Sequence, residues 1–142
     1  MRIPVDAIFA RMLTGVHEAG YTDIVPAHLT VLRYPGPDNR RPSELAADTR
    51  MSKQAMNYLL GQLEQLGYLT RVDDPSDQRF KRVQLTSRGH ALVLVIRETV
   101  RTIETELADE LGADRLEQLR ALLVELNGTK LVGSVAGDPR GA

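Results

Sequence analysis

Five polar residues near the middle of the 142-residue chain carry groups that can recognise a nucleic acid. Their hydroxyl, ammonium and amide groups can contact phosphates and base edges, and the amides of Gln and Asn can form bidentate pairs with adenine. A helix start at this point would also direct free backbone N–H groups toward phosphates. The same residue types are typical of a solvated helix face, so the patch alone leaves both interpretations open. The five residues are Ser52, Lys53, Gln54, Asn57 and Tyr58.

The charges of the chain are unevenly distributed. The total of 18 basic and 19 acidic residues gives a net charge of -1, which on its own argues against a nucleic-acid partner. Residues 33–90, however, hold 10 basic and 7 acidic side chains, whereas residues 91–142 hold 6 and 9. Because phosphate affinity depends on Lys and Arg presented on one face, the basic middle matters more than the total.

The elements that must position these residues are mostly helical. Prolines suit the starts of helices over residues 4–19, 26–33 and 42–49, and Ser52 and Gly67 suit the two ends of a fourth helix. Apolar residues recur every three or four positions along them. In the first helix they form one apolar face, made of Val5, Ile8, Phe9, Met12, Leu13 and Val16. The expected inward residues are Leu29 and Leu32 in the second helix, and Ala55, Leu59, Leu63 and Leu66 in the fourth.

After Gly67 the pattern changes to two short strands, residues 68–72 and 80–85, on either side of a polar turn at 73–79. A long helix follows from residue 87 or 88 to about 110, and a last helix covers roughly residues 113–127. The glycine-rich tail, 128–142, has no helical period, and we expect most of it to be loosely ordered. The predicted fold class is mainly α with a small β-hairpin.

A short helix, a turn, a longer helix and a hairpin follow in the order of a winged helix-turn-helix, whose longer helix fits the major groove of DNA. The run from Asp74 to Gly89 resembles the signature of the multiple-antibiotic-resistance regulator (MarR) family of bacterial transcription factors: an acidic turn with Asp-x-Arg, a strand, then Leu-Thr-x-x-Gly. The helix-turn-helix also looks like that of the family, with Glu44-Leu45-Ala46 in the first of its helices and Leu63-Glu64-x-x-Gly67-Tyr68-Leu69 closing the second. The resemblance covers about residues 5–126.

The resemblance implies that Arg79 at the wing tip enters the minor groove of an operator while Asp77 holds its guanidinium. Arg is favoured in narrow minor grooves, and a carboxylate two residues away can orient it through charge-assisted hydrogen bonds. The alternative is an exposed ion pair of little consequence. Lys81 and Arg82 point to opposite sides of a strand, so we expect only one of them, assigned as Lys81, to face phosphate.

The sequence also predicts assembly into a homodimer. The apolar run 91–96 surrounds its helix for two turns and must be covered on more than one side, either by helices of the same chain or by a second copy. We expect residues 1–20 and 88–127 to form dimerisation helices around a DNA-binding lobe at 26–87. Family members are often released from DNA by a small aromatic or phenolic effector, and the corresponding cleft here would draw on Phe9, Leu13, His17, Tyr21 and His28, which are equally suited to packing.

Other classes of function find little support. The absence of cysteine excludes disulfides and thiol-based sensing, and the three histidines lie on different elements, so no metal site or cofactor is expected. No phosphate loop or nucleophile elbow indicates an enzyme. No apolar run reaches the roughly 18 residues of a membrane span, and the N-terminus lacks a signal-peptide core, so a cytoplasmic location is expected. A winged-helix module that binds protein instead of DNA remains the alternative function.

Overall fold

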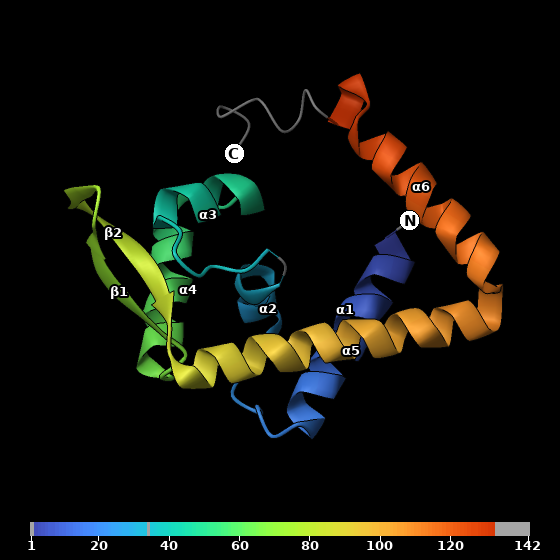
Figure 1. Ribbon diagram of the computed structural model, residues 1–142, viewed down its shortest axis with the longest axis horizontal. Helices are drawn as coiled ribbons and strands as arrows, with labels where there is room; N and C mark the ends of the chain where they lie inside the picture. The colour runs from blue at the N-terminus through green and yellow to red at the C-terminus, as the bar shows by residue number, and fades with distance from the viewer. Residues whose placement is uncertain (1, 34, 133–142) are drawn as a thin grey trace. The chain divides into compact units, whose positions relative to one another are not determined.

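The computed structural model describes residues 2–33 and 35–132, which form two units divided after Val100. The fold is mainly α with a single two-stranded antiparallel hairpin in this part of the chain, which confirms the fold class predicted from the sequence (Figure 1). The elements are α1 (Arg2–Glu18), α2 (Pro26–Leu32), α3 (Pro42–Thr49), α4 (Lys53–Gln65), β1 (Leu69–Asp74), β2 (Asp77–Leu85), α5 (Ser87–Leu111) and α6 (Ala113–Asn127).

The boundaries of α2, α3 and α4 follow from local chemistry. Proline occupies the first helical position of α2 and of α3, where its missing N–H has no intrahelical partner to lose. The Ser52 side chain caps α4 by accepting a 3.0 Å hydrogen bond from the backbone N–H of Ala55. Gly67 follows α4 with a φ of 84°, a left-handed conformation that favours glycine.

One inward position of α4 was predicted incorrectly. Ala55 is exposed, whereas Met56 is fully buried. The buried side of the helix begins at Met56 and continues at i+3, i+4 and i+7, and Leu66 at its end is only half-buried. Ala55 lies in the capped first turn and faces away from this side. The buried residues of α4 are Met56, Leu59, Leu60 and Leu63.

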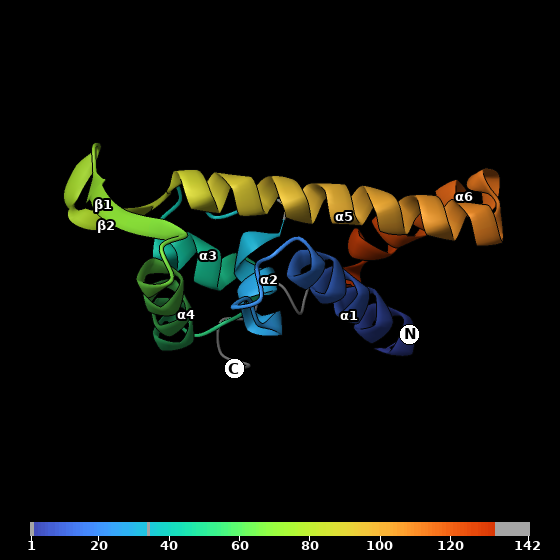
Figure 2. The same cartoon turned by 90° about the horizontal axis from the view of Figure 1, so that it is seen from below.

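The hairpin is longer than predicted, so the turn assigned to residues 73–79 is wrong at both ends. Its register runs from Leu69 opposite Leu85 to Asp74 opposite Asp77, which leaves only residues 75 and 76 for the turn. In both views the hairpin lies next to α4 and its tip projects past the helices (Figure 1 and Figure 2). We call this hairpin the wing.

The free edge of β2 is paired with the loop that precedes α3. The backbone N–H of Asn39 donates to the carbonyl of Val83 (2.7 Å), and the N–H of Val83 donates to the carbonyl of Arg40 (2.9 Å). The carboxylate of Asp38 accepts a further bond from the N–H of Leu85. The loop therefore fixes the base of the wing to the start of α3.

Glycines allow two close approaches in the unit of residues 1–100. A Cβ on Gly89 would lie 1.9 Å from the carbonyl oxygen of Tyr68, so α5 can start against this backbone only with glycine there. A Cβ on Gly15 would lie 2.5 Å from Cγ2 of Thr99, which places α1 against α5. Within the apolar run at the start of α5, Leu92 and Ile96 are buried but Leu94 is 60% exposed.

The unit that begins at Arg101 contains the end of α5 and all of α6. No residue of α6 is buried, although the helix carries several large apolar side chains. Arg120 joins the two helices through an ion pair with Glu104 (3.2 Å). Most of the predicted tail, 133–142, lies outside the described residues, and none of the described helices is long and apolar enough to cross a membrane. The exposed apolar residues of α6 are Leu119, Leu122, Leu123, Val124 and Leu126.

Candidate nucleic-acid interface

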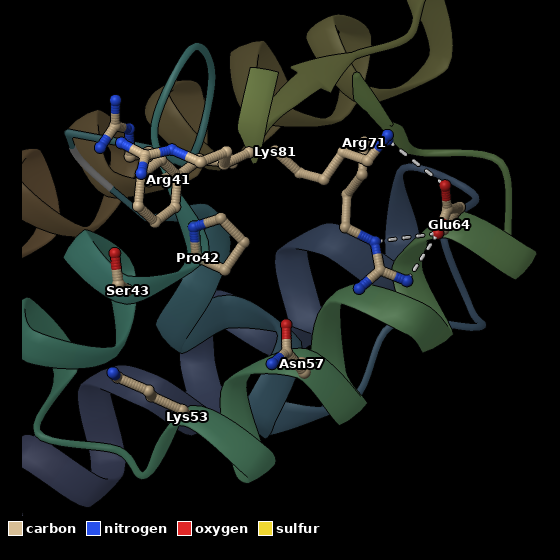
Figure 3. A pocket seen from close by; sticks show the side chains of 10 residues that line it. Arg41, Pro42, Ser43, Lys53, Asn57, Glu64, Arg71 and Lys81 are labelled. Carbon is tan, nitrogen blue, oxygen red and sulfur yellow. Dashed lines mark hydrogen bonds and ion pairs between the residues drawn. The ribbon is translucent and has the colours of Figure 1, made fainter. Parts of the chain in front are cut away.

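A groove of about 590 Å³ lies between the wing, the start of α3 and the side of α4 that carries Lys53, Asn57 and Glu64 (Figure 3). Five of its ten lining residues are cationic and one is acidic. That acid, Glu64, is bound to Arg71 of β1 by hydrogen bonds of 2.9 and 3.2 Å. The lining residues are Arg41, Pro42, Ser43, Lys53, Asn57, Glu64, Arg71, Arg79, Phe80 and Lys81.

The groove brings together four of the eight residues that the sequence assigned to DNA contact. Lys53 and Asn57, one helical turn apart on α4, line one wall, and Arg79 and Lys81 of β2 line another. Ser52, Gln54 and Tyr58 are exposed on the same helix but outside the groove lining. The cationic walls therefore come from two elements separated in sequence, as the two-part contact of a helix and a wing requires.

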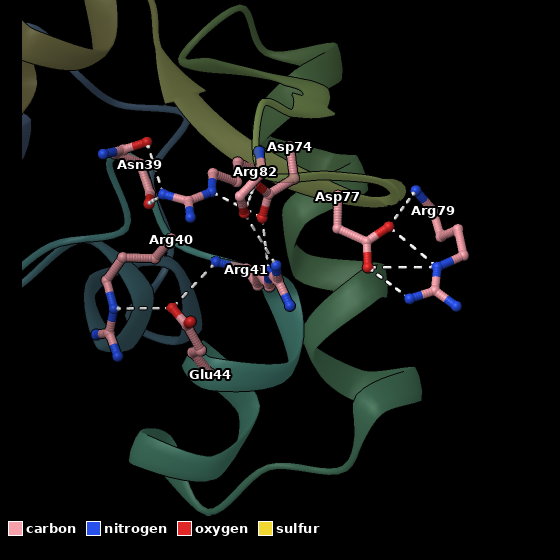
Figure 4. A network of polar contacts seen from close by, with 9 residues as sticks. Asn39, Arg40, Arg41, Glu44, Asp74, Asp77, Arg79 and Arg82 are labelled. Atoms are coloured by element: carbon pink, nitrogen blue, oxygen red, sulfur yellow. Dashed lines mark hydrogen bonds and ion pairs between the residues drawn. The ribbon is translucent and has the colours of Figure 1, made fainter.

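The wing tip, which we define as Asp77 and Arg79, is an ion pair with several hydrogen bonds between its two side chains (Figure 4). The guanidinium of Arg79 donates from Nε to Oδ1 (3.0 Å) and from Nη2 to Oδ2 (2.7 Å) of Asp77. Asp77 also accepts from the backbone N–H of Arg79 (3.2 Å). The hydrogen bonds from Arg79 lower the pKa of Asp77, and the bond to Asp77 raises the pKa of Arg79. The Arg79 side chain is nevertheless 84% exposed, so the carboxylate orients a guanidinium whose outer edge faces solvent.

The wing base, which we define as Arg41, Asp74 and Arg82, is a buried counterpart of this pair. The Asp74 side chain has no exposed surface, and its Oδ2 lies 2.6 Å from Nε of Arg41 and 2.8 Å from Nε of Arg82. Its Oδ1 accepts hydrogen bonds from the N–H (2.9 Å) and hydroxyl (2.6 Å) of Ser76. The Ser76 hydroxyl, followed by Arg82, lowers the pKa of Asp74 far below its ordinary value. The wing base therefore joins the hairpin turn to the N-cap of α3.

Phe80 links the wing base to the wing tip. Its ring lies 4.5 Å from the guanidinium carbon of Arg41 and 5.9 Å from that of Arg79. The face of an aromatic ring attracts both cations. Arg41, Asp74 and Phe80 were not among the site residues predicted from the sequence. Arg41 stands immediately before a proline that starts a helix, and Asp74 opens the run that resembles the family signature, but neither signal pairs these two residues, which lie 33 positions apart.

The opposite directions expected for Lys81 and Arg82 are present. Lys81 is exposed in the groove and pairs with Asp73 across the hairpin. Arg82 is turned inward to Asp74 and also donates to the side-chain oxygen of Asn39 (3.2 Å). Of the two, Lys81 has the position required for contact with phosphate, and its role there remains a prediction.

The residues assigned to an effector cleft make contacts within the chain. His17 hydrogen bonds through Nε2 with the carbonyl of Ile24 (2.7 Å), and the ring of Phe9 lies 5.4 Å from the guanidinium carbon of Arg33. Tyr21 packs near Tyr68, with ring centroids 6.2 Å apart. His28 is buried and Leu13 is half-buried. An effector would therefore meet groups that already have partners, and the cleft remains a prediction.

The two short helices, the longer α4 and the wing define this chain as a winged helix-turn-helix protein. Residues 23–79 match a family model described as the MarR family. A MarR family transcription regulator of known structure has a TM-score of 0.76 at 19% identity, with 97% of this chain and 89% of that chain covered. The winged helix-turn-helix of this chain is therefore similar to that of the MarR family, in agreement with the resemblance found in the sequence.

Two further solved structures contain DNA. The transcriptional repressor CouR, bound to a 23-mer duplex, is 25% identical with a TM-score of 0.70, and the match covers 88% of this chain and 87% of CouR. A mutant of MepR from S. aureus, bound to an oligodeoxyribonucleotide, is 22% identical with a TM-score of 0.60, and the match covers 89% and 92% of the two chains. The first two of these similar proteins are thus described as regulators of transcription, and CouR and the MepR mutant are seen on DNA.

Proposed function

We propose that this protein is a sequence-specific regulator of transcription that binds double-stranded DNA through α4 and the wing. The observation that carries the proposal is the groove with cations on both walls, in which the exposed Arg79 is held by Asp77. The helix wall would contact phosphates and base edges through Lys53 and Asn57, and the wing tip would enter the minor groove. Ser52, Gln54 and Tyr58 would extend the contact along α4, and Lys81 would meet the backbone. On this proposal the chain is a binding protein and not an enzyme, which suits the cytoplasmic location expected from the sequence.

We further propose that it acts as a homodimer on a palindromic operator. The apolar residues exposed on α6, together with Leu94 of α5 and Val5 of α1, support a cover supplied by a second copy. Residues 1–20 and 88–127 would form the dimer, and residues 26–87 would form the DNA-binding lobe. Two copies would place their recognition helices one DNA turn, about 34 Å, apart. A repressor role is proposed because CouR is a repressor and because repression requires only that the operator be occupied.

Selection of bound sequences from a random duplex pool tests both statements. We expect the selection to enrich a palindrome whose half-sites are separated by about one helical turn. A separate measurement of the protein mass in solution should give twice the mass of one chain. A single enriched half-site would contradict the dimeric mode. No enrichment at about 100 mM salt would contradict DNA recognition and would favour a module that binds protein.

Release by a small aromatic or phenolic effector completes the proposal. Such a molecule acts only if it binds the DNA-free arrangement more tightly than the DNA-bound one. We expect at least one compound in a panel of phenols and aromatic acids to raise the Tm of the free protein and to weaken the DNA complex. Substitution of Leu13 by Trp, which would fill the cleft, should abolish both effects. A panel without any such compound would contradict this part.

A further inference from the structure

A chain of hydrogen bonds runs from the start of α2 through a buried histidine to the exposed face of α4. The backbone N–H of Val25 donates to Nδ1 of His28 (3.2 Å), and Nε2 of His28 lies 3.0 Å from Oε1 of Gln62. Nε2 of Gln62 in turn donates to the hydroxyl of Tyr58 (3.0 Å). His28 is only 3% exposed, whereas Tyr58 is 68% exposed on the helix that faces DNA in the proposed function.

We call these three hydrogen bonds the relay. The donor and acceptor of each bond in the relay are determined by the first donor, the backbone N–H of Val25. A backbone N–H can only donate, so Nδ1 of His28 is an acceptor and the ring carries its hydrogen on Nε2. That hydrogen requires an acceptor, which selects Oε1 of Gln62 and leaves its NH₂ group to face Tyr58. The opposite amide orientation would set two donors against each other. The Tyr58 oxygen must therefore accept.

We propose that His28 and Gln62 are positioning residues that present the hydroxyl of Tyr58 to DNA as a hydrogen-bond donor. Because the oxygen already accepts a bond from Gln62, its own hydrogen is directed elsewhere, and the accepted bond strengthens it as a donor. Phosphate oxygens and purine N7 atoms only accept, so they match this polarity. The inference rests on the proposed function for the role of α4, whereas the donor-to-acceptor direction of the hydrogen bonds from Val25 to Tyr58 is independent of that function.

A double-mutant cycle on the full chain tests the proposal. Tyr58→Phe should weaken binding to the selected operator about threefold to tenfold, the range for one hydrogen bond. Gln62→Glu keeps an acceptor for His28 but offers Tyr58 only acceptors, so the hydroxyl should turn toward the carboxylate. Adding Tyr58→Phe to Gln62→Glu should then change affinity less than about twofold. An unchanged effect of Tyr58→Phe in that background would overturn the proposal.

Gln65→Glu is the matched control, since it places the same charge at an exposed position of the same helix. Tyr58→Phe should keep its full effect in the Gln65→Glu background, and its loss there would overturn the proposal by assigning the coupling to charge alone. The two possible acceptors are also separable. A loss equal on operator and random duplexes indicates phosphate, whereas a loss on the operator alone indicates a base edge.

A spectroscopic measurement on the wild-type protein needs neither DNA nor a variant. Imidazole ¹⁵N shifts at about pH 7.5 should show His28 with hydrogen on Nε2 and a bare Nδ1. Hydrogen on Nδ1 of His28 would overturn the proposal, because the donor-to-acceptor direction of the relay requires this atom to accept. A protein that shows this tautomer but binds no DNA would instead contradict the proposed function, so the two failures are distinguishable.

Discussion

The wing base and the wing tip both pair aspartate with arginine, but the aspartate is buried in the wing base, whereas the arginine is exposed in the wing tip. In the wing base, the buried carboxylate of Asp74 lies between Arg41 and Arg82 and is completed by two hydrogen bonds from Ser76. In the wing tip, Asp77 binds the edge of the Arg79 guanidinium that carries Nε and Nη2, and the Arg79 side chain is otherwise open to solvent. Three positions along the hairpin therefore separate a carboxylate that attaches the wing from one that orients an exposed guanidinium.

Burial explains the difference between the two regions. A buried carboxylate must be matched by enough donors to replace its water, so the loss of its charge leaves two arginines without compensation. An exposed pair adds little to stability because water competes for both groups. We therefore expect substitutions in the wing base to act on folding, and substitutions in the wing tip to act on binding.

The largest expected effect is that of Asp74→Asn on stability. The substitution keeps the shape of the side chain but removes the charge that Arg41 and Arg82 share. We expect Tm at pH 7 to fall by about 5–15 °C, measured by circular dichroism. Asp73→Asn is the control, since it removes the same charge from an exposed position paired with Lys81. Equal Tm values for the two variants would erase the proposed distinction between buried and exposed carboxylates.

The pH dependence of this effect follows from the direction of the pKa shift. The pKa of Asp74 is lowered from 3.8, first by the Ser76 hydroxyl and then by Arg82. As pH falls, the unfolded chain binds the proton first, so the stabilisation is complete above about pH 5 and is lost progressively below about pH 4. The Tm gap between wild type and Asp74→Asn should therefore narrow in acid. A gap still constant at about pH 3 would show that the charge of Asp74 is not its cause.

The second effect in size is that of Arg79→Ala on DNA affinity. We expect binding to the operator to weaken about tenfold to a hundredfold, because the substitution removes a sequence-specific interaction. Tm should change by less than about 2 °C, since the side chain is exposed. Arg97→Ala removes the same charge from an exposed position on α5 and should leave operator affinity nearly unchanged. Anisotropy titrations at fixed salt measure the operator affinity of both variants. Similar losses of affinity would show that Arg79 contributes only through its general positive charge.

A smaller effect is expected on the helix wall of the groove. Lys53→Ala should weaken binding about threefold to tenfold on every duplex alike, because an ammonium in this position contacts phosphate. The slope of log affinity against log salt should fall by about one. A loss confined to one base pair of the operator would show that Lys53 reads sequence, and would place specificity in α4 more than in the wing tip.

What the sequence predicted well is what local chemistry decides. Proline and serine near helix starts and glycine near helix ends gave the order and approximate bounds of α1 to α6, the helices of the described part of the chain, and α3 and α6 matched in full. Lys53, Asn57, Arg79 and Lys81, which the sequence predicted to contact DNA, all line the groove, and their contact with DNA stays a prediction.

What the sequence missed depends on contacts between distant segments. Asp73 and Asp74 suggested a turn by their residue type, but Asp74 is buried in strand β1 because Arg41 and Arg82 compensate its charge. The relay from His28 to Tyr58 was missed for the same reason, since Gln62 lies 34 residues after His28. Ala55 was placed inward because it lies four residues before Leu59, but the buried side of α4 begins at Met56, three residues before Leu59.

The smallest and most discriminating effect is that of Asp77→Asn. Removing a negative charge near DNA favours binding, but losing the bonds to Nε and Nη2 of Arg79 frees its side chain and disfavours binding. Asp73→Asn removes the same charge on the same hairpin without touching Arg79, so the difference between the two variants isolates orientation. We expect Asp73→Asn to tighten operator binding slightly, and Asp77→Asn to bind about twofold to fivefold more weakly than Asp73→Asn. In an Arg79→Ala background this difference should vanish, because no guanidinium remains to be oriented. A difference that persists there would mean that Asp77 acts on DNA by its own charge, and the wing tip would then be two independent groups instead of one oriented pair.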